Sequence, residues 1–396
     1  MSPPSDLRPL APTRLPVTVL TGFLGSGKTT LLNALVRQPA MADTAVIINE
    51  FGEIGLDHLL VEKVDDTMVE LMSGCLCCTV RGDLAKTLAD LAQRRYRKEI
   101  PAFKRVVIET TGLADPAPIL QTLMTDDALA QRYTLDSVVT VVDAVNGAGT
   151  LDRHHEAVKQ AAVADRLIVS KTDCLEGSRA GIEPLLARLR VLNPGASVTE
   201  AVKGGIAPDV LFGAGVYDPS TKVPDVQRWL NEEAYRDRHA DHDHGGHDHD
   251  GHADGGHDHG GHRRSGQNPH DVNRHDDRIS AFCIARDQPI SMAAFTLFLE
   301  LLAMLHGERL LRVKGLLNVA EHPDTPAVIH GVQHVFHPAV WLERWPDDDR
   351  RSKLVFITRD VPQADIERVL DALDADDPVL ASGLAARLSS ANETAS

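Results

Sequence analysis

The sequence predicts an α/β fold, in which a mostly parallel sheet carries helices on both faces and is followed by a smaller α+β domain. Three observations support this prediction. Short β-branched runs alternate with helical patterns over residues 15–212, a His- and Gly-rich segment then interrupts the chain, and a second region of strands and helices spans 278–375. Strands that alternate with helices form parallel sheets covered on both faces. With 396 residues, 43% of them hydrophobic, the chain is long and apolar enough for large buried cores.

The expected strands of the first domain are apolar, rich in β-branched residues and too short to be helices. They are Val17–Leu20, Ala45–Ile48, Val106–Ile108, Val138–Val142 and Leu167–Val169. Helical patterns separate them. These cover Thr29–Arg37, Leu84–Arg97, Pro116–Ala128 and Arg179–Leu192, and a further helix is expected to open at His154.

The second domain and the segments around it follow from the same patterns. Strands are expected at Ile279–Ala285, Leu310–Val319, Ala327–Val335 and Lys353–Ile357, and helices at Met292–Leu305 and Gln363–Leu373. Residues 239–262 contain nine His, seven Gly and six Asp, and a segment without core-forming side chains cannot offset the entropy of ordering. We therefore expect a flexible tail over 1–14, a disordered linker over 213–277 and a second flexible tail over 376–396.

Charge and composition exclude several classes of protein. The formal net charge is −16 without any Lys/Arg-rich tract, which disfavours binding to nucleic acid or to an acidic membrane surface. No apolar run approaches the roughly 18–20 residues of a membrane span, and the N-terminal segment lacks the apolar core of a secretory signal. Three of the five cysteines are clustered, which favours metal or redox chemistry over disulfides. We expect a cytoplasmic protein.

Residues 22–29 read G-F-L-G-S-G-K-T and match the phosphate-binding pattern G-x-x-x-x-G-K-[ST] of the P-loop at every position. The segment follows an apolar strand and opens a helix, which is the context that the pattern requires. Lys28 should then contact the β- and γ-phosphates, and the Thr29 hydroxyl should ligate Mg²⁺. An ordinary Gly-rich turn is the alternative. The expected nucleotide-binding residues of this segment are Gly22, Gly25, Ser26, Gly27, Lys28, Thr29 and Thr30.

A second signal lies at the end of the strand Val106–Ile108. Glu109 ends this strand, and Gly112 follows three residues later. An acid at this place can hold Mg²⁺ directly or through water, and the glycine can turn toward a γ-phosphate. Aspartate is the usual acid here. We therefore expect Gly112 beside the γ-phosphate, and the expected catalytic residues are Lys28, Thr29 and Glu109.

Residues 170–173 read S-K-T-D and resemble the guanine-reading element N-K-x-D at the end of another strand. Asp173 would accept hydrogen bonds from guanine N1 and N2, and Lys171 would lie along the base. Adenine offers no matching pair of donors, so this element favours GTP over ATP. Ser170 stands where asparagine is usual. The alternatives are an ordinary polar turn and, for the whole chain, an ATP-dependent small-molecule kinase.

The cysteine cluster is the most distinctive chemistry in the sequence. Cys75, Cys77 and Cys78 lie within four residues, directly after Gly74. In an extended segment Cys75 and Cys77 point to the same side, and thiolates select Zn²⁺ or Cu(I) over Mg²⁺. Three thiolates leave a tetrahedral site one ligand short, which suits an ion that must be handed on. Glu50 could add an oxygen ligand. Buried structural cysteines or a redox role are the alternatives for the cluster, and a solvated acidic turn is the alternative for Glu50.

The His-rich segment offers a second, weaker place for metal. Imidazoles two residues apart on a Gly-rich backbone suit Zn²⁺, Cu²⁺ and Ni²⁺. The candidate ligands are His242, His244, His247, His249, His257 and His259. A solvating spacer is the alternative.

Taken in order, these motifs resemble the CobW-like metal-chaperone GTPases. The matching segments are Gly22–Thr30, Asn49–Glu53, Gly74–Cys78, Glu109–Gly112 with the following Ala114-Asp115-Pro116, and Ser170–Asp173. The second domain resembles the C-terminal domain of that family at 312–315, which read R-V-K-G, and at 330–333, which read H-G-V-Q. The C-x-C-C element is the most specific part of the resemblance.

The resemblance implies hydrolysis of GTP with Mg²⁺ and a Zn²⁺ ion, or a related ion such as Co²⁺ or Ni²⁺, on Cys75, Cys77 and Cys78. It also implies delivery of the ion to a client metalloprotein, for which the C-terminal domain is the expected recognition surface. A non-catalytic zinc buffer or storage protein and a cobalt or nickel insertion GTPase are the alternatives. The client, the physiological metal and the oligomeric state, with a homodimer among the alternatives, stay open.

Overall fold

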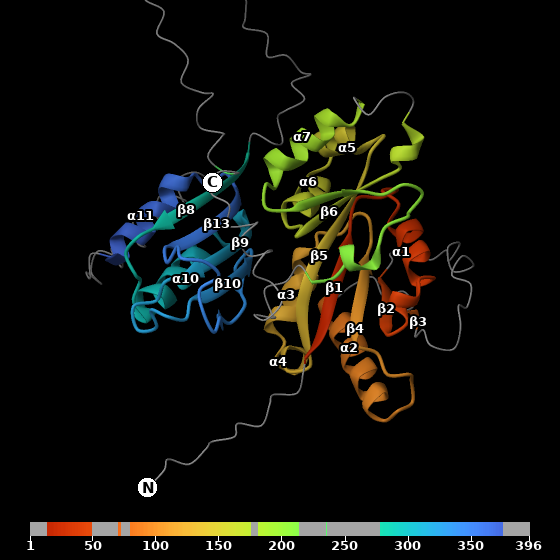
Figure 1. Cartoon of the computed structure of the whole chain (residues 1–396), viewed down its shortest axis with the longest axis horizontal. Coiled ribbons are helices and arrows are strands. Elements are labelled where there is room, and N and C mark those ends of the chain that lie inside the picture. Colours follow the sequence, from red (N-terminus) through yellow and green to blue (C-terminus); the bar gives the residue numbers. More distant parts are fainter. Residues whose placement is uncertain are drawn as a thin grey trace, which may run out of the picture.

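The computed structural model describes residues 14–49, 70–72, 80–175, 181–213, 235 and 278–374. Two sheets lie next to each other, one from each half of the chain, and helices pack around them (Figure 1). The expected tails and most of the expected linker lie outside the described residues. Within the described ranges, no helix is long and apolar enough to cross a membrane.

The first sheet has seven strands, all paired in parallel, in the order β3-β2-β4-β1-β5-β6-β7. The strands are β1 (Leu15–Thr21), β2 (Thr44–Asn49), β3 (Glu70–Met72), β4 (Arg105–Thr110), β5 (Tyr133–Asp143), β6 (Arg166–Ser170) and β7 (Ser197–Glu200). Because parallel strands point the same way, their carboxyl ends meet at one edge, where α/β proteins place their ligands. The loops that begin after β1, β4 and β6 therefore come together at this edge.

Helices cover both faces of the first sheet, as the sequence predicts. They are α1 (Lys28–Val36), α2 (Val80–Tyr96), α3 (Ala117–Thr125), α4 (Asp127–Ala130), α5 (Gly147–Arg153), α6 (His155–Ala162) and α7 (Glu183–Leu192). Successive side chains of a strand point to opposite faces, so Val107 of β4 packs with α1, whereas Val106 and Ile108 pack with α2 and α3. The predicted α/β class is confirmed.

The second sheet is antiparallel, with the order β11-β10-β9-β13-β8 and with β12 paired to β10. Its strands are β8 (Ile279–Arg286), β9 (Leu310–Leu317), β10 (Ala327–Val332), β11 (Val335–Phe336), β12 (Val340–Trp341) and β13 (Ser352–Arg359). One face packs on α10 (Met292–His306) and α11 (Gln363–Asp374). The predicted α+β domain is confirmed.

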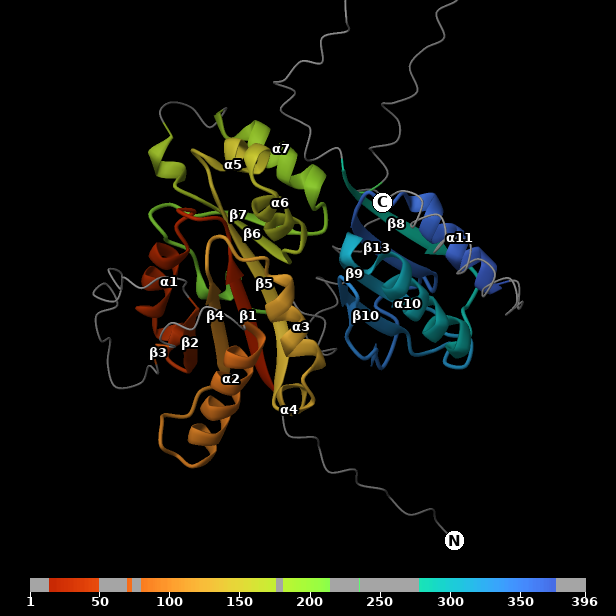
Figure 2. The same cartoon turned by 180° about the vertical axis from the view of Figure 1, so that it is seen from behind.

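The other face of the second sheet packs toward the first domain, on the side of α3 (Figure 2). Leu311 and Val355 of this sheet share one hydrophobic cluster with Ile119 and Leu123 of α3. Tyr235, which falls within the expected linker, is buried in the same cluster. Burial of apolar side chains from both halves of the chain therefore holds the two domains together.

Several elements differ from their predicted bounds for local reasons. The helix expected over Pro116–Ala128 stops before Asp126, because the Asp126 side chain accepts a hydrogen bond from the Leu129 N–H at 3.0 Å and caps the separate helix α4. The strand expected over Ala327–Val335 is divided, because Gln333 has a φ of 55° and turns the chain between β10 and β11. The strands β3 and β7 have three and four residues, too few for a hydrophobic pattern to reveal.

Candidate functional site

Glycines shape the loop between β1 and α1. Gly22, Gly25 and Gly27 have φ values of 141°, 75° and 93°, a region of backbone conformation that favours glycine. A Cβ atom on Gly22 would lie 2.3 Å from the carbonyl oxygen of Val141, so a larger residue would push the loop away from β5. The helix α1 begins at Lys28, and its first N–H groups can bind an anion held in this loop.

The three expected catalytic residues lie together at this loop. Lys28 is only 8% exposed, and its Nζ donates hydrogen bonds to the carbonyl oxygens of Gly22 (2.8 Å) and Phe23 (3.3 Å). The Thr29 hydroxyl donates to Oε1 of the buried Glu109 at 2.8 Å. A hydroxyl and a carboxylate are the oxygen ligands that Mg²⁺ prefers, so this pair fits the ion that the sequence predicts.

The loop after β4 lies directly against the loop after β1. A Cβ atom on Gly112 would lie 2.5 Å from both the backbone nitrogen and the Cα of Leu24, so only glycine permits this contact. Gln160 of α6 holds the other side of the Gly112 loop. Its Nε2 donates to the carbonyl oxygens of Gly112 at 3.3 Å and Ala114 at 3.0 Å.

The expected guanine-reading element is also joined to the loop after β1. Ser170 Oγ donates to the carbonyl oxygen of Ser26 at 2.5 Å. Lys171 Nζ donates to the carbonyl oxygen of Gly25 at 2.6 Å and to Asp143 Oδ2 at 2.7 Å. A serine hydroxyl therefore makes the link between the two loops in a position where the usual motif has asparagine.

The remaining expected nucleotide contacts, Asp173 and Thr30, are exposed to solvent. Asp173 is exposed, and its Oδ1 accepts a hydrogen bond from the backbone N–H of Lys203 at 3.1 Å. Thr30 is exposed in the first turn of α1. The Asp173 carboxylate is thus accessible to a base that enters from solvent.

Sequence reasoning missed two polar residues that support these loops, Asp143 and Gln160. Burial alone would raise the pKa of Asp143, but hydrogen bonds from Lys171 and Asn146 outweigh it and hold the pKa below its ordinary value. Asp143 thus stays ionised and fixes the Lys171 ammonium group. An acid at the end of β5 resembles Glu109 at the end of β4, and that similarity is the signal that could have identified it. Gln160 has no comparable local signal.

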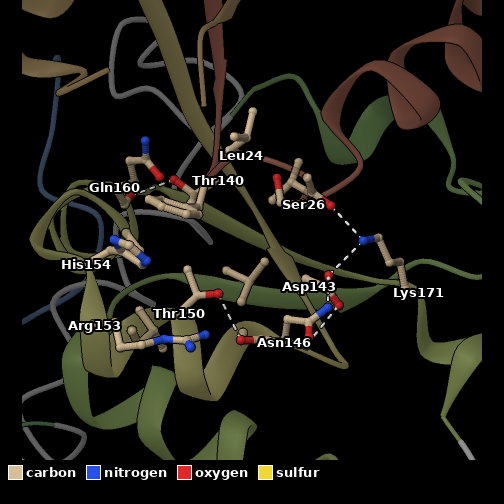
Figure 3. A pocket seen from close by; sticks show the side chains of 17 residues that line it. Leu24, Ser26, Thr140, Asp143, Asn146, Thr150, Arg153, His154, Gln160 and Lys171 are labelled. Carbon is tan, nitrogen blue, oxygen red and sulfur yellow. Dashed lines mark hydrogen bonds and ion pairs between the residues drawn. The ribbon is translucent and has the colours of Figure 1, made fainter. Parts of the chain in front are cut away.

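A cavity of about 260 Å³ adjoins the outer side of the loop after β1 (Figure 3). It lies between residues 23–26 of that loop, the end of β5 and the helices α5 and α6. The rings of Phe23 and His154 stack on one of its walls, with centroids 4.4 Å apart. Neither Lys28 nor Thr29 lines the cavity, so it adjoins residues 23–26 of the loop and not the part that opens α1.

The predicted metal ligands lie outside the described residues: Cys75, Cys77, Cys78, Glu50 and the six histidines of the expected linker. Within the part of the chain that the structure describes, no group of three or more His, Cys, Asp or Glu side chains could hold a metal ion. The described strands do show where two of these segments begin. Glu50 directly follows β2, and Cys75 lies three residues after the end of β3.

Comparisons with known proteins agree with this geometry. Residues 16–200 match the family model of the CobW/HypB/UreG nucleotide-binding domain, and residues 279–374 match the C-terminal domain of the cobalamin synthesis protein CobW. The zinc chaperone YjiA of Escherichia coli is 30% identical over 357 residues, which cover 90% of this chain and 98% of YjiA.

Two further similarities concern a second relative and a solved structure. The zinc-regulated GTPase metalloprotein activator 1 of Schizosaccharomyces pombe is 39% identical over 175 residues, 42% of this chain and 41% of that protein. The crystal structure of the Zn(II)-bound YjiA GTPase from E. coli superposes with a TM-score of 0.61 at 28% identity, and the match covers 91% of this chain and 99% of the other.

Proposed function

The chain belongs to the CobW family of P-loop GTPases, and from this premise we propose that it binds zinc and couples GTP hydrolysis to the transfer of that metal to a client metalloprotein. The name of its relative YjiA, a zinc chaperone that matches over almost its whole length, supports zinc as the cargo. Cobalt or nickel is the alternative cargo. The proposed location is the cytoplasm, where thiols stay reduced and can bind metal.

The register of three neighbouring strands carries this proposal. Ile48 of β2 pairs with Met72 of β3 on one side and with Glu109 of β4 on the other. The chain therefore leaves β2 toward Glu50, and β3 toward the cysteines, at the level of the carboxylate that contacts Thr29. The two segments that carry the proposed metal ligands would therefore start close to the nucleotide, and GTP hydrolysis could change the positions of these ligands.

Hydrolysis itself would use groups that the described loops bring together. The Lys28 ammonium group would exchange its two carbonyl partners for phosphate oxygens, and the α1 N-terminus would add N–H donors. Thr29 and Glu109 would hold Mg²⁺, which neutralises charge on the β- and γ-phosphate oxygens when it is bound. The Asp173 carboxylate would accept hydrogen bonds from guanine, with Lys171 alongside the base.

Contacts between the domains offer a route by which the nucleotide could act on client binding. The helix α3 follows the Gly112 loop, and its Gln121 donates a hydrogen bond to Oε1 of Gln333 in the second domain at 2.8 Å. Asp165, just after α6, forms ion pairs with Arg312 (2.8 Å) and Lys314 (2.6 Å) of β9. We therefore assign client recognition to the C-terminal domain, because it contacts segments that adjoin the nucleotide loops.

Phosphate release measured with and without Zn²⁺ tests the proposal directly. We expect GTP turnover to respond to Zn²⁺ in the unmodified chain, and Cys77→Ser to abolish this response and to lower Zn²⁺ affinity by orders of magnitude. Excess ATP should not displace GTP from the site. If the chain were instead an ATP-dependent kinase, ATP would displace GTP. GTP turnover that is absent, or that is indifferent to Zn²⁺ in a chain that still binds it, would favour a non-catalytic zinc buffer.

A further inference from the structure

The loop that carries Gly112 is held by two adjacent residues of α6 that lie outside every motif described above. Lys159 forms an ion pair with Asp115 at 2.9 Å, and both side chains are partly exposed. Gln160, in contrast, is fully buried. Its single amide group, Nε2, donates to two carbonyl oxygens of the loop, those of Gly112 and Ala114. A buried donor shared between two backbone acceptors fixes the course of that loop.

Gln160 is in turn fixed by its own surroundings. Its backbone carbonyl accepts a hydrogen bond from Thr140 Oγ1 of β5 at 2.6 Å. His154, which directly precedes α6, stacks on Phe23 of the loop after β1. The helix α6 and its N-cap residue therefore contact both loops that meet at Gly112 and Leu24, and Gln160 holds the second of these loops.

We propose that Gln160 is a positioning residue that makes the site distinguish GTP from GDP. It holds the Gly112 backbone at the distance from the P-loop at which that backbone meets the γ-phosphate. GDP has no γ-phosphate, so the position of this loop matters for GTP and not for GDP. The inference rests on the proposed function, because it names a residue that acts on the same GTP site.

The test replaces the amide donor by an apolar group of similar length, in Gln160→Met. The matched control is Gln38→Met. The Nε2 of Gln38 also donates to a carbonyl oxygen far away in the sequence, that of Ile206 at 3.0 Å, but not to the Gly112 loop.

Affinities for GDP and for a non-hydrolysable GTP analogue are measured together with kcat and KM. We expect Gln160→Met to weaken the GTP analogue about tenfold, the loss of one to two hydrogen bonds. GDP affinity should change less than about twofold on the same scale, and kcat should fall. Gln38→Met should leave the ratio of the two affinities unchanged.

A second variant, Gln160→Glu, adds a readout that a purely structural role would not move. An ionised carboxylate would face two carbonyl oxygens and repel them, whereas the protonated acid can donate one hydrogen bond again. Burial raises the pKa of a carboxyl group, so affinity for the GTP analogue should recover as the pH falls from about 8 to about 6. GDP affinity should not follow this pH profile, and neither should Gln38→Glu.

Each other outcome overturns the proposal. Equal weakening of GDP and the GTP analogue, an unchanged affinity ratio, or loss of the folded state in both Gln160 variants would reduce Gln160 to a structural residue. Failure of the proposed function looks different, because it shows in the unmodified chain, whose GTP turnover would then be absent or indifferent to Zn²⁺.

Discussion

Strand β6 has one aspartate directly before it and another shortly after it, and their surroundings are opposite. The side chain of Asp165 is 3% exposed and lies between the cationic groups of Arg312 and Lys314 in the second domain. Asp173 is exposed and accepts a hydrogen bond from a backbone N–H. The protein neutralises the first carboxylate with its own cations and leaves the second accessible to a ligand. One end of β6 thus joins the domains, and the other end is suited to read a nucleotide.

The charge balance at Asp165 explains why this end of β6 is held strongly against the second domain. Burial alone would raise the pKa of the Asp165 carboxyl group, but the charges of Arg312 and Lys314 outweigh burial and hold the pKa below its usual range. A backbone hydrogen bond from Val138 to the same carboxylate adds to this effect. Charges buried in this way are costly to separate, because each would have to remain in the interior without its counter-ion.

The largest expected effect concerns the domain interface. Asp165→Asn should lower the free energy of unfolding by about 3–5 kcal/mol, because Arg312 and Lys314 would lose the buried carboxylate that neutralises them. Urea unfolding followed by circular dichroism measures this loss.

The structure supplies a matched control for that variant at the surface. Asp349 also contacts one arginine and one lysine, Arg351 at 2.8 Å and Lys353 at 2.8 Å, but its side chain is 29% exposed. Asp349→Asn should cost no more than about 1 kcal/mol, since water solvates the separated charges. Equal losses in the two variants would show that burial at the interface does not set the strength of the cluster.

At the other end of β6 we expect an effect on the nucleotide and not on stability. Asp173→Asn should weaken GTP binding by about 1.5–3 kcal/mol, the range for a hydrogen bond to a charged group. It should raise the affinity for xanthosine nucleotides, because the asparagine amide can donate to the 2-oxo group. The free energy of unfolding should stay within about 0.5 kcal/mol of the unmodified value. Unchanged GTP affinity would remove Asp173 from the nucleotide site.

The interface aspartate should also shape the acid end of the stability profile. Its pKa is lower in the folded chain than in the unfolded chain, where aspartate titrates near a pH of about 3.9. The stabilisation is therefore complete above that pH and is lost as the pH falls toward the depressed pKa, with a slope of about 1.4 kcal/mol per pH unit. Stability measured at several acidic pH values should show this slope in the unmodified chain and a reduced slope in Asp165→Asn.

The sequence could predict the features that depend on local patterns of residues, and it could not predict those that depend on contacts between distant segments. The loop over 22–29 was predictable because its glycines, lysine and threonine encode a backbone shape within eight residues, and the strands were predictable from their apolar runs. The partners of Asp165 and Gln160 were not. Arg312 lies 147 positions from Asp165, and Gly112 lies 48 positions from Gln160. Contacts at such separations depend on the tertiary fold, and they leave no periodic or adjacent signal in the chain.

The smallest expected effect tests whether the nucleotide end of β6 is held more weakly than the interface end. Ser170 joins that end to the P-loop through one hydroxyl, which donates to the Ser26 carbonyl oxygen. A neutral hydrogen bond contributes about 0.5–1.5 kcal/mol, so Ser170→Ala should lower the free energy of unfolding, measured by urea unfolding, by about 1 kcal/mol. GTP affinity should fall by a similar amount, because Lys171 follows Ser170 directly and moves with it. Ser170→Asn, which restores the residue usual in the motif, offers a longer donor to the same carbonyl and should keep GTP affinity close to that of the unmodified chain. If Ser170→Ala cost as much stability as Asp165→Asn, both ends of β6 would be held equally strongly, and the contrast between a strongly paired interface and a weakly held nucleotide end would not hold.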